Sequence, residues 1–258
     1  MTSSQAIIIK PDWHYSLENG SVLHFKMGQN GGTYGLQRTG QILWVILNIV
    51  RNCNFLKKTL LFQEGSILLS KILERQAKFV NLNNTYILEL GAGCCGVPGQ
   101  VAASLGSHVI LTDVAEEIIP LLENVKKNTG DHFVNRVDVK ELNWNDFLYN
   151  SDIQNYFFQF DFDYILCADL LYEHTYILVA KVILIFLKHN PSSQVLMTNA
   201  NRKHVHLFRR KLSSILVFED LISKDIDSNY TNGQVAWLLK SKTGSDIKSI
   251  SDLLKLNF

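Results

Sequence analysis

Two carboxylates and the glycines between them carry the strongest chemical signal in this 258-residue sequence. Glu89 lies near the end of an apolar run, and glycines follow at positions 91, 93 and 96. Because glycine lacks a Cβ and readily adopts positive φ, such a loop lets a ligand lie against its backbone. Asp113 ends the next apolar run, where an acidic side chain can accept hydrogen bonds from a ribose. The spacing predicts a βαβ unit that binds an adenosine-containing ligand.

The spacing alone leaves three interpretations of this unit open. A dinucleotide site would use the loop and the following helix N-terminus to hold a pyrophosphate. A site for S-adenosylmethionine holds no phosphate and usually has an acidic residue two positions before the first loop glycine, where Glu89 stands. The third interpretation is a strand-to-helix turn that binds nothing.

Composition excludes several classes of protein. The sequence is 47% hydrophobic and 19% charged, which is ordinary for a soluble globular protein. A formal net charge of +1 gives no long-range field for nucleic acid or an acidic membrane. The longest apolar stretches, 42–50 and 182–187, are shorter than the roughly 18 residues of a membrane span. The local cluster 209–211 (RRK) is interpreted as a solvated helix face.

The N-terminus and the cysteines indicate where the protein works. The first residues lack the basic start and apolar core of a signal peptide. Four cysteines show no metal-ligand spacing, and we expect no metal. Reduced thiols fit a cytoplasmic protein that also occurs in the nucleus.

Strand-like and helix-like runs alternate along most of the chain. Strands are expected at 86–90, 108–112, 137–140, 163–167, 194–198, 215–219 and 234–240, and helices at 41–51, 65–78, 97–105, 116–128, 176–188 and 202–214. This alternation predicts an α/β fold: a Rossmann-like, seven-stranded, mainly parallel sheet with helices on both faces and an antiparallel final strand. We expect an irregular N-terminal extension over 1–40 with one short strand at 22–26, a core domain over 41–242 and a C-terminal tail over 243–258.

Parallel α/β sheets bind ligands outside the carboxyl ends of their strands. Three such ends should therefore meet at one site: the glycine loop, Asp113, and the segment that follows the strand at 163–167. That segment places Asp169 and Tyr172 just beyond an apolar strand. Considered singly, Asp169 could be a helix N-cap and Tyr172 a core aromatic residue.

With these segments together, the chain resembles the seven-β-strand methyltransferases. More narrowly, it resembles the methyltransferase-like protein-lysine methyltransferases, whose members modify chaperones and translation factors. Five segments carry the resemblance: 39–44 (TGQILW), 89–93 (ELGAG), 111–113 (LTD), 141–144 (ELNW) and 163–172 (DYILCADLLY). The chain departs from the family in a loop over 94–99 that is one residue longer, in Val45 where relatives often have aspartate, and in a loose match over 199–202.

The resemblance implies a set of site residues and partners. S-adenosylmethionine would be the cofactor, and a protein such as a chaperone or translation factor would be the substrate of a monomeric enzyme that binds neither nucleic acid nor membrane. The implied cofactor-binding residues are Trp44, Gly91, Ala92, Gly93, Asp113, Trp144 and Ala168, and the implied catalytic residues are Asp169 and Tyr172.

The chemistry of methyl transfer is consistent with this set. The sulfonium is already an activated leaving group, so the protein must position an unprotonated nucleophile and exclude water. A lysine amine has a reference pKa near 10.4, and desolvation in an aromatic-lined slot lowers that pKa. Methyl transfer to arginine, histidine or a small amine is an alternative, and so is a cofactor-binding scaffold without catalysis.

Overall fold

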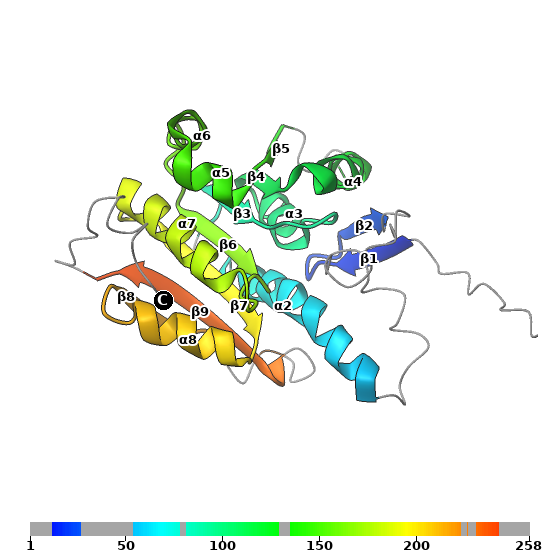
Figure 1. Ribbon diagram of the computed structural model, residues 1–258. Helices are drawn as coiled ribbons and strands as arrows, with labels where there is room; N and C mark the ends of the chain where they lie inside the picture. Colours follow the sequence, from blue (N-terminus) through cyan, green and yellow to red (C-terminus); the bar gives the residue numbers. More distant parts are fainter. Residues whose placement is uncertain are drawn as a thin grey trace, which may run out of the picture.

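The structure is a computed structural model, and it describes residues 12–26, 54–77, 81–128, 135–222, 226 and 231–242 (Figure 1). The strands are β1 (Asp12–Ser16), β2 (Val22–Lys26), β3 (Tyr86–Leu90), β4 (His108–Asp113), β5 (Val137–Glu141), β6 (Tyr164–Ala168), β7 (Gln194–Ala200), β8 (Leu216–Asp220) and β9 (Gln234–Ser241). The helices are α2 (Asn54–Gln76), α3 (Val97–Ser104), α4 (Ala115–Asn128), α5 (Trp144–Tyr149), α6 (Ser151–Phe157), α7 (Tyr176–His189) and α8 (Lys203–Leu212).

Seven strands form one sheet in the order β5-β4-β3-β6-β7-β9-β8. The first five of these are parallel, and β9 is antiparallel to both β7 and β8. The central strands are continuous apolar runs because helices cover both of their faces, as the buried residues 87–90 of β3 illustrate. The α/β fold, the mainly parallel sheet and the antiparallel final strand expected from the sequence are confirmed.

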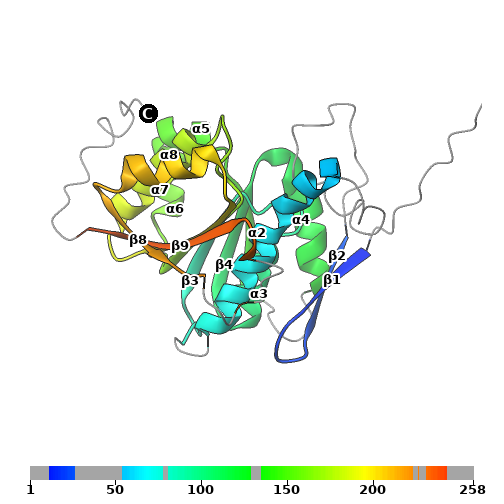
Figure 2. The same cartoon turned by 90° about the horizontal axis from the view of Figure 1, so that it is seen from below.

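The helices lie in two layers that enclose the sheet (Figure 2). On one face α2, α3 and α4 pack against it, and α5, α7 and α8 lie on the other. Helix α7 is buried along 182–187 because it lies between the sheet and its neighbouring helices. The loops that follow the parallel strands meet at the carboxyl ends of these strands, between the two helix layers.

The N-terminal region contains a β-hairpin, so the expectation of one isolated strand there was incomplete. Strands β1 and β2 pair antiparallel, and they alternate buried residues (Tyr15, Leu23, Phe25) with exposed ones (His14, Ser16, His24). The buried face joins the core cluster that contains α2, α3 and α4. This period of two explains the strand structure, since each buried side chain is separated from the next by one that faces solvent.

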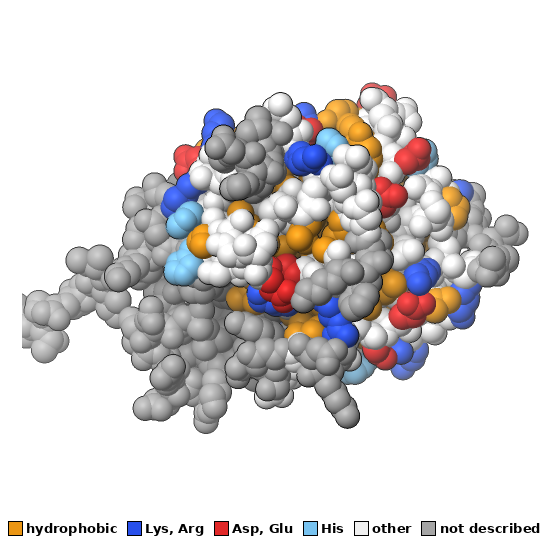
Figure 3. Space-filling view, turned by 180° about the vertical axis from the view of Figure 1, so that it is seen from behind, with side chains coloured by type: hydrophobic (Ala, Val, Ile, Leu, Met, Phe, Trp, Pro, Cys, Tyr) orange, Lys and Arg blue, Asp and Glu red, His pale blue; other side chains and the backbone are white. Residues whose placement is uncertain are grey.

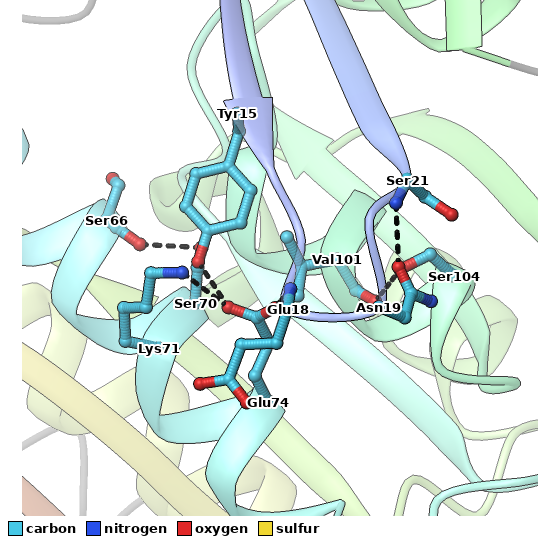
Figure 4. Close-up of polar contacts among 10 residues, drawn as sticks. All are labelled: Tyr15, Glu18, Asn19, Ser21, Ser66, Ser70, Lys71, Glu74, Val101 and Ser104. Atoms are coloured by element: carbon cyan, nitrogen blue, oxygen red, sulfur yellow. Dashed lines mark hydrogen bonds and ion pairs between the residues drawn. The ribbon is translucent and has the colours of Figure 1, made fainter.

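A buried carboxylate fastens the hairpin to α2 (Figure 4). Tyr15 donates a hydrogen bond to Glu74 Oε2 at 2.7 Å, and the Glu18 amide donates to Glu74 Oε1 at 2.6 Å. Lys71 Nζ lies 2.9 Å from Glu74 Oε2 and 4.7 Å from the centre of the Tyr15 ring. Because Glu74 is only 4% exposed, these partners offset the cost of burying its charge.

Two further differences from the sequence expectation concern helices. Helix α2 begins at Asn54 rather than 65, and the helix expected over 41–51 lies outside the described residues. The short helices α5 and α6 were missed. Each begins after an asparagine whose side chain accepts from the first backbone N–H groups: Asn143 for α5 and Asn150 for α6.

Candidate functional site

The glycine loop between β3 and α3 has the backbone conformation that its sequence predicts. Gly91, Gly93 and Gly96 have φ values of 63°, 61° and 53°. A Cβ at Gly91 would lie 2.6 Å from Leu170 Cδ2 and 3.3 Å from Trp144 Cζ2. The first loop glycine therefore lies against side chains from two other strand ends, and three segments of the predicted site meet here.

Asp113 connects the end of β4 to the glycine loop. Its Oδ2 accepts a hydrogen bond from the Gly93 amide at 2.7 Å, and its Oδ1 accepts from the Val114 amide at 2.7 Å. Burial raises the pKa of the Asp113 carboxyl, while these two hydrogen bonds act in the opposite direction. The Ala92 amide also donates to the Thr112 carbonyl at 2.9 Å. The loop is held in place by β4 through both backbone and side chain.

Glu89 lies beneath the loop instead of lining it. The side chain is 2% exposed, and its Oε2 accepts from the Gly99 amide in the first turn of α3 at 2.7 Å. Burial, together with a smaller effect of the nearby Asp113 charge, raises the pKa of Glu89 to about 8, although the Gly99 hydrogen bond acts in the opposite direction. Glu89 thus accepts from a backbone N–H group in the first turn of α3 and links that helix to β3.

The longer loop over 94–99 follows a path fixed by two amide side chains. Asn124 Nδ2 donates to the Cys94 carbonyl at 2.6 Å, and Gln100 Nε2 donates to the Cys95 carbonyl at 2.7 Å. The two cysteine Sγ atoms are 3.6 Å apart, and both residues are free thiols. The loop turns at Gly96, where a Cβ would lie 2.8 Å from Leu111 Cδ1.

Asp169 lies beneath α2 with only 6% of its surface exposed. Its Oδ1 accepts from the Ala200 amide at 2.9 Å, and its amide donates to the Thr198 carbonyl at 2.8 Å. A Cβ at Gly65 of α2 would lie 2.2 Å from Asp169 Oδ2, so only glycine leaves room there. The Gly65 carbonyl in turn accepts from Thr198 Oγ1 at 2.8 Å. Asp169 has a φ of 55° and is no helix N-cap, because α7 starts after Thr175.

The turn after Asp169 is fixed by side chains of Asn199 and Thr175. Asn199 Oδ1 accepts from the Leu171 amide at 3.0 Å. Thr175 Oγ1 donates to the Leu170 carbonyl at 2.5 Å and accepts from the Tyr172 amide at 3.0 Å. These bonds set the position of Tyr172, which is half-buried and whose ring centre lies 5.3 Å from Arg202 Cζ.

The predicted site residues mostly come together at this edge of the sheet. Gly91, Ala92, Gly93, Asp113 and Trp144 share the contacts above, with Trp144 half-buried at the first residue of α5. Ala168 ends β6, which pairs with β3 and β7, and Asp169 and Tyr172 follow it. Trp44 lies outside the described residues.

Three residues that position the site were missed in the sequence: Gly65, Asn199 and Arg202. Gly65 offered a usable signal, because glycine inside a helical pattern costs about 1 kcal/mol relative to alanine and indicates a close approach. Asn199 and Arg202 lie in the segment 199–202, whose match to the family is loose, and a polar residue after a strand has many ordinary roles.

Within the described ranges, metal-ligand clusters and membrane-spanning helices are both absent. No group of three or more histidine, cysteine or acidic side chains there could hold a metal ion. The helices of that same part of the chain include none long and apolar enough to cross a membrane.

Comparisons with known proteins agree on one family. A family model described as lysine methyltransferase matches residues 40–213. The chain is 36% identical over 113 residues to protein-lysine methyltransferase METTL21E of Bos taurus, covering 44% of this chain and 38% of that protein. It is 30% identical over 144 residues to EEF1A lysine methyltransferase 3 of Xenopus tropicalis, covering 55% of this chain and 59% of that protein. The chain thus spans less than half the length of the bovine relative.

One solved structure shows the same fold. The 16S rRNA N2 G1207 methyltransferase of T. Thermophilus, in complex with AdoMet and guanosine, aligns with a TM-score of 0.51 and 14% identity. The alignment covers 90% of this chain and 50% of that one.

Proposed function

Since this chain belongs to the lysine methyltransferase family, we propose that it transfers methyl groups from S-adenosylmethionine to lysine side chains of a protein substrate. The observation that carries the proposal is the meeting of the Gly91 loop, Trp144 and Leu170 at the strand ends. A cofactor loop and the turn that bears Asp169 and Tyr172 are thereby in contact, as transfer between two ligands requires.

The residues present fit the cofactor. Gly91 to Gly93 offer a loop backbone without bulky side chains, and Asp113 lies beside that loop with a carboxylate able to accept from a ribose. Trp144 and Ala168 would border the adenosine and methionine parts. When bound, S-adenosylmethionine supplies an activated methyl group. Trp44 stays a prediction from the sequence.

A dinucleotide fits this loop less well. Pyrophosphate binding at a helix N-terminus requires open backbone N–H groups. Here the Gly99 amide of α3 already donates to the buried Glu89 carboxyl. This arrangement disfavours a phosphate at the start of α3 and leaves a phosphate-free nucleoside as the better ligand.

The acceptor side of the site divides its work between two residues. Tyr172 is half-buried and offers a phenol and a ring face to an incoming amine. Asp169 is buried beneath α2, where its carboxylate accepts from the Ala200 amide. This position favours a role in holding the turn in place. The Arg202 cation near Tyr172 disfavours an ammonium there, and thus favours the neutral amine that can attack the methyl group.

The proposed substrate is a protein. The names of the bovine and Xenopus relatives support a protein acceptor, and a translation factor or a chaperone is the class we propose. The monomeric state and the cytoplasmic or nuclear location stay predictions from the sequence.

Calorimetry and a lysine-blocking experiment test the proposal. S-adenosylhomocysteine should bind, whereas NAD and ATP should not. Label from S-adenosylmethionine should enter proteins of a cell extract, and acetylation of all lysines beforehand should abolish that transfer. Transfer that survives the blocking would favour arginine or histidine acceptors. Cofactor binding without any transfer would favour a scaffold.

A further inference from the structure

The segment between Glu173 and Glu219 contains no acidic residue. It includes seven lysines and arginines: Lys181, Lys188, Arg202, Lys203, Arg209, Arg210 and Lys211. The whole chain has a formal net charge of only +1. Positive charge is therefore concentrated in the part of the fold that contains α7 and α8, while acidic residues lie elsewhere.

Helix α8 displays part of this charge along one line. Its buried residues Val205, Phe208 and Leu212 pack in the core, whereas Lys203, His206 and Arg210 are exposed. Residues three, four and seven apart lie on one face of a helix. We call this line of exposed residues (Lys203, His206 and Arg210) the α8 stripe. It extends about 10 Å at 1.5 Å per residue.

Acidic neighbours neutralise other cations but leave the stripe uncompensated. Arg209 lies 3.6 Å from Asp220, and Lys240 lies 3.1 Å from Glu219. Within the described part of the chain, Lys203 and Arg210 form no ion pair. On the opposite side of the molecule, Lys and Arg side chains are interspersed with Asp and Glu side chains (Figure 3).

The stripe begins at the rim of the candidate site. Arg202, the residue before α8, lies with its Cζ 5.3 Å from the centre of the Tyr172 ring. In the first turn of α8, the His204 ring lies 5.6 Å from the Tyr176 ring. From this contact the helix continues beside α7 (Figure 2). A chain bound at Tyr172 could therefore continue along α8.

We propose that the α8 stripe, together with Arg202, docks an acidic segment of the protein substrate next to the acceptor lysine. The proposal rests on the proposed function, which places the acceptor at Tyr172. Aspartate and glutamate side chains of the substrate would pair with Arg202, Lys203 and Arg210. Such pairs are exposed to solvent, so they select and steer an acidic substrate more than they hold it tightly.

A protein segment fits this surface better than RNA does. Proteins that bind single-stranded nucleic acid combine positive charge with aromatic side chains on which bases stack. The aromatic residue of α8, Phe208, is buried, and the exposed residues of the stripe offer no aromatic ring besides His206. The stripe therefore supplies charge without a stacking platform.

Two peptides and two double variants test the inference. The first peptide has one lysine followed by a run of glutamates, and the second has glutamines in their place. The test variant is Lys203→Glu with Arg210→Glu. The control is Lys126→Glu with Lys127→Glu, which makes the same change in net charge on exposed residues at the end of α4.

Fluorescence anisotropy at low salt should show that the wild type binds the glutamate peptide and that added salt weakens this binding. The test variant should bind it roughly tenfold more weakly, and the control should keep its affinity. In the transfer assay the test variant should raise KM for this peptide and leave kcat unchanged. Equal affinity for the two peptides, or equal losses in the two variants, would overturn the inference.

The assay also separates the inference from the proposed function. Glutamate-dependent binding without transfer to either peptide would refute the methyltransferase activity and uphold the docking surface. Labelled oligouridylate serves as the RNA probe. If it binds more tightly than the glutamate peptide, and if the test variant loses this binding, the partner of the stripe is RNA and not a protein segment.

Discussion

The proposed cofactor half of the site (β3, β4 and the loop between them) and the proposed acceptor half (the ends of β6 and β7 with 169–175) are built in different ways. In the cofactor half, nearby residues hold the loop: Asp113 binds the Gly93 amide and Glu89 binds the Gly99 amide. In the acceptor half, support comes from farther along the chain, since Thr198 bonds to the Gly65 carbonyl.

This difference separates a general function from a specific one. A loop shaped by its own βαβ unit can bind the same cofactor in many proteins. The acceptor half depends on α2 and α8, whose sequences can vary with the substrate. We therefore expect substitutions in the first half to alter cofactor affinity and those in the second to alter transfer.

The largest expected effect concerns the acceptor half. Asp169→Ala and Tyr172→Phe should each reduce the rate of methyl transfer roughly a hundredfold, because each removes a positioning or proton-handling group. S-adenosylhomocysteine affinity, measured by calorimetry on the same folded proteins, should change little. Asp138→Ala, an exposed aspartate on β5, is the control and should leave both quantities unchanged. Equal losses of rate and affinity would erase the distinction between the halves.

The reverse pattern is expected in the cofactor half. Asp113→Ala removes a carboxylate that holds the Gly93 amide and is expected to bind the ribose. S-adenosylhomocysteine affinity should fall by about 1.5–3 kcal/mol, the range for a lost hydrogen bond to a charged group. The transfer rate at saturating cofactor should recover most of its wild-type value. Unchanged affinity in a folded protein would remove Asp113 from the cofactor site.

A pair of glycine substitutions sharpens the role of the loop. Gly91 and Gly20 both have positive φ, so alanine at either position costs roughly 1–2 kcal/mol of stability. Only at Gly91 would the new Cβ also meet Leu170 and Trp144, whereas nothing lies within 4 Å at Gly20. Denaturant unfolding should show a loss in both variants that is larger for Gly91→Ala, and only Gly91→Ala should weaken S-adenosylhomocysteine binding. Normal binding by Gly91→Ala would show that the loop tolerates displacement.

The smallest expected effect is a pH dependence of stability from Glu89. Burial raises its pKa from the ordinary 4.5 to about 8, so the folded protein binds this proton more tightly than the unfolded chain does. The resulting stability is fully present below the unfolded pKa and is lost as pH rises toward about 8, with a slope of at most about 1.4 kcal/mol per pH unit.

Glu89→Gln should reduce that slope, measured by urea unfolding at about pH 6 and about pH 7. Burial also raises the pKa of Asp113, which adds a slope of the same sign in both proteins. The difference between the two slopes therefore isolates Glu89. Identical slopes would show that Glu89 does not change protonation on folding.

The cofactor half could be predicted closely from the sequence because its information is local. The run at 86–90 is β3 to the residue, and the glycines adopt the positive φ their type allows. The hairpin β1–β2 was predicted only in part: the strand expected at 22–26 is β2 to the residue, whereas β1 was missed. Its anchor to Glu74 is a long-range contact that no local pattern shows.

The acceptor half could be predicted only in part. Asp169 and Tyr172 were predicted as site residues from their place after a strand, but the burial of Asp169 depends on Gly65, far away in sequence. The cluster over 209–211 was interpreted as one solvated face. In the structure Arg209 packs 5.3 Å from the Trp237 ring, whereas Arg210 is exposed on the α8 stripe. Tertiary packing therefore decides which of these cationic side chains remain exposed to a partner.

The most direct test of the whole account is to identify the residue that receives the methyl group. The protein is incubated with labelled S-adenosylmethionine and cell extract, and the labelled site is mapped by mass spectrometry, with Asp169→Ala as the control. The account predicts methyllysine, with acidic residues close to it in the substrate, and strongly reduced label in the control. Label on arginine or histidine, or no transfer by a protein that binds S-adenosylhomocysteine, would contradict it.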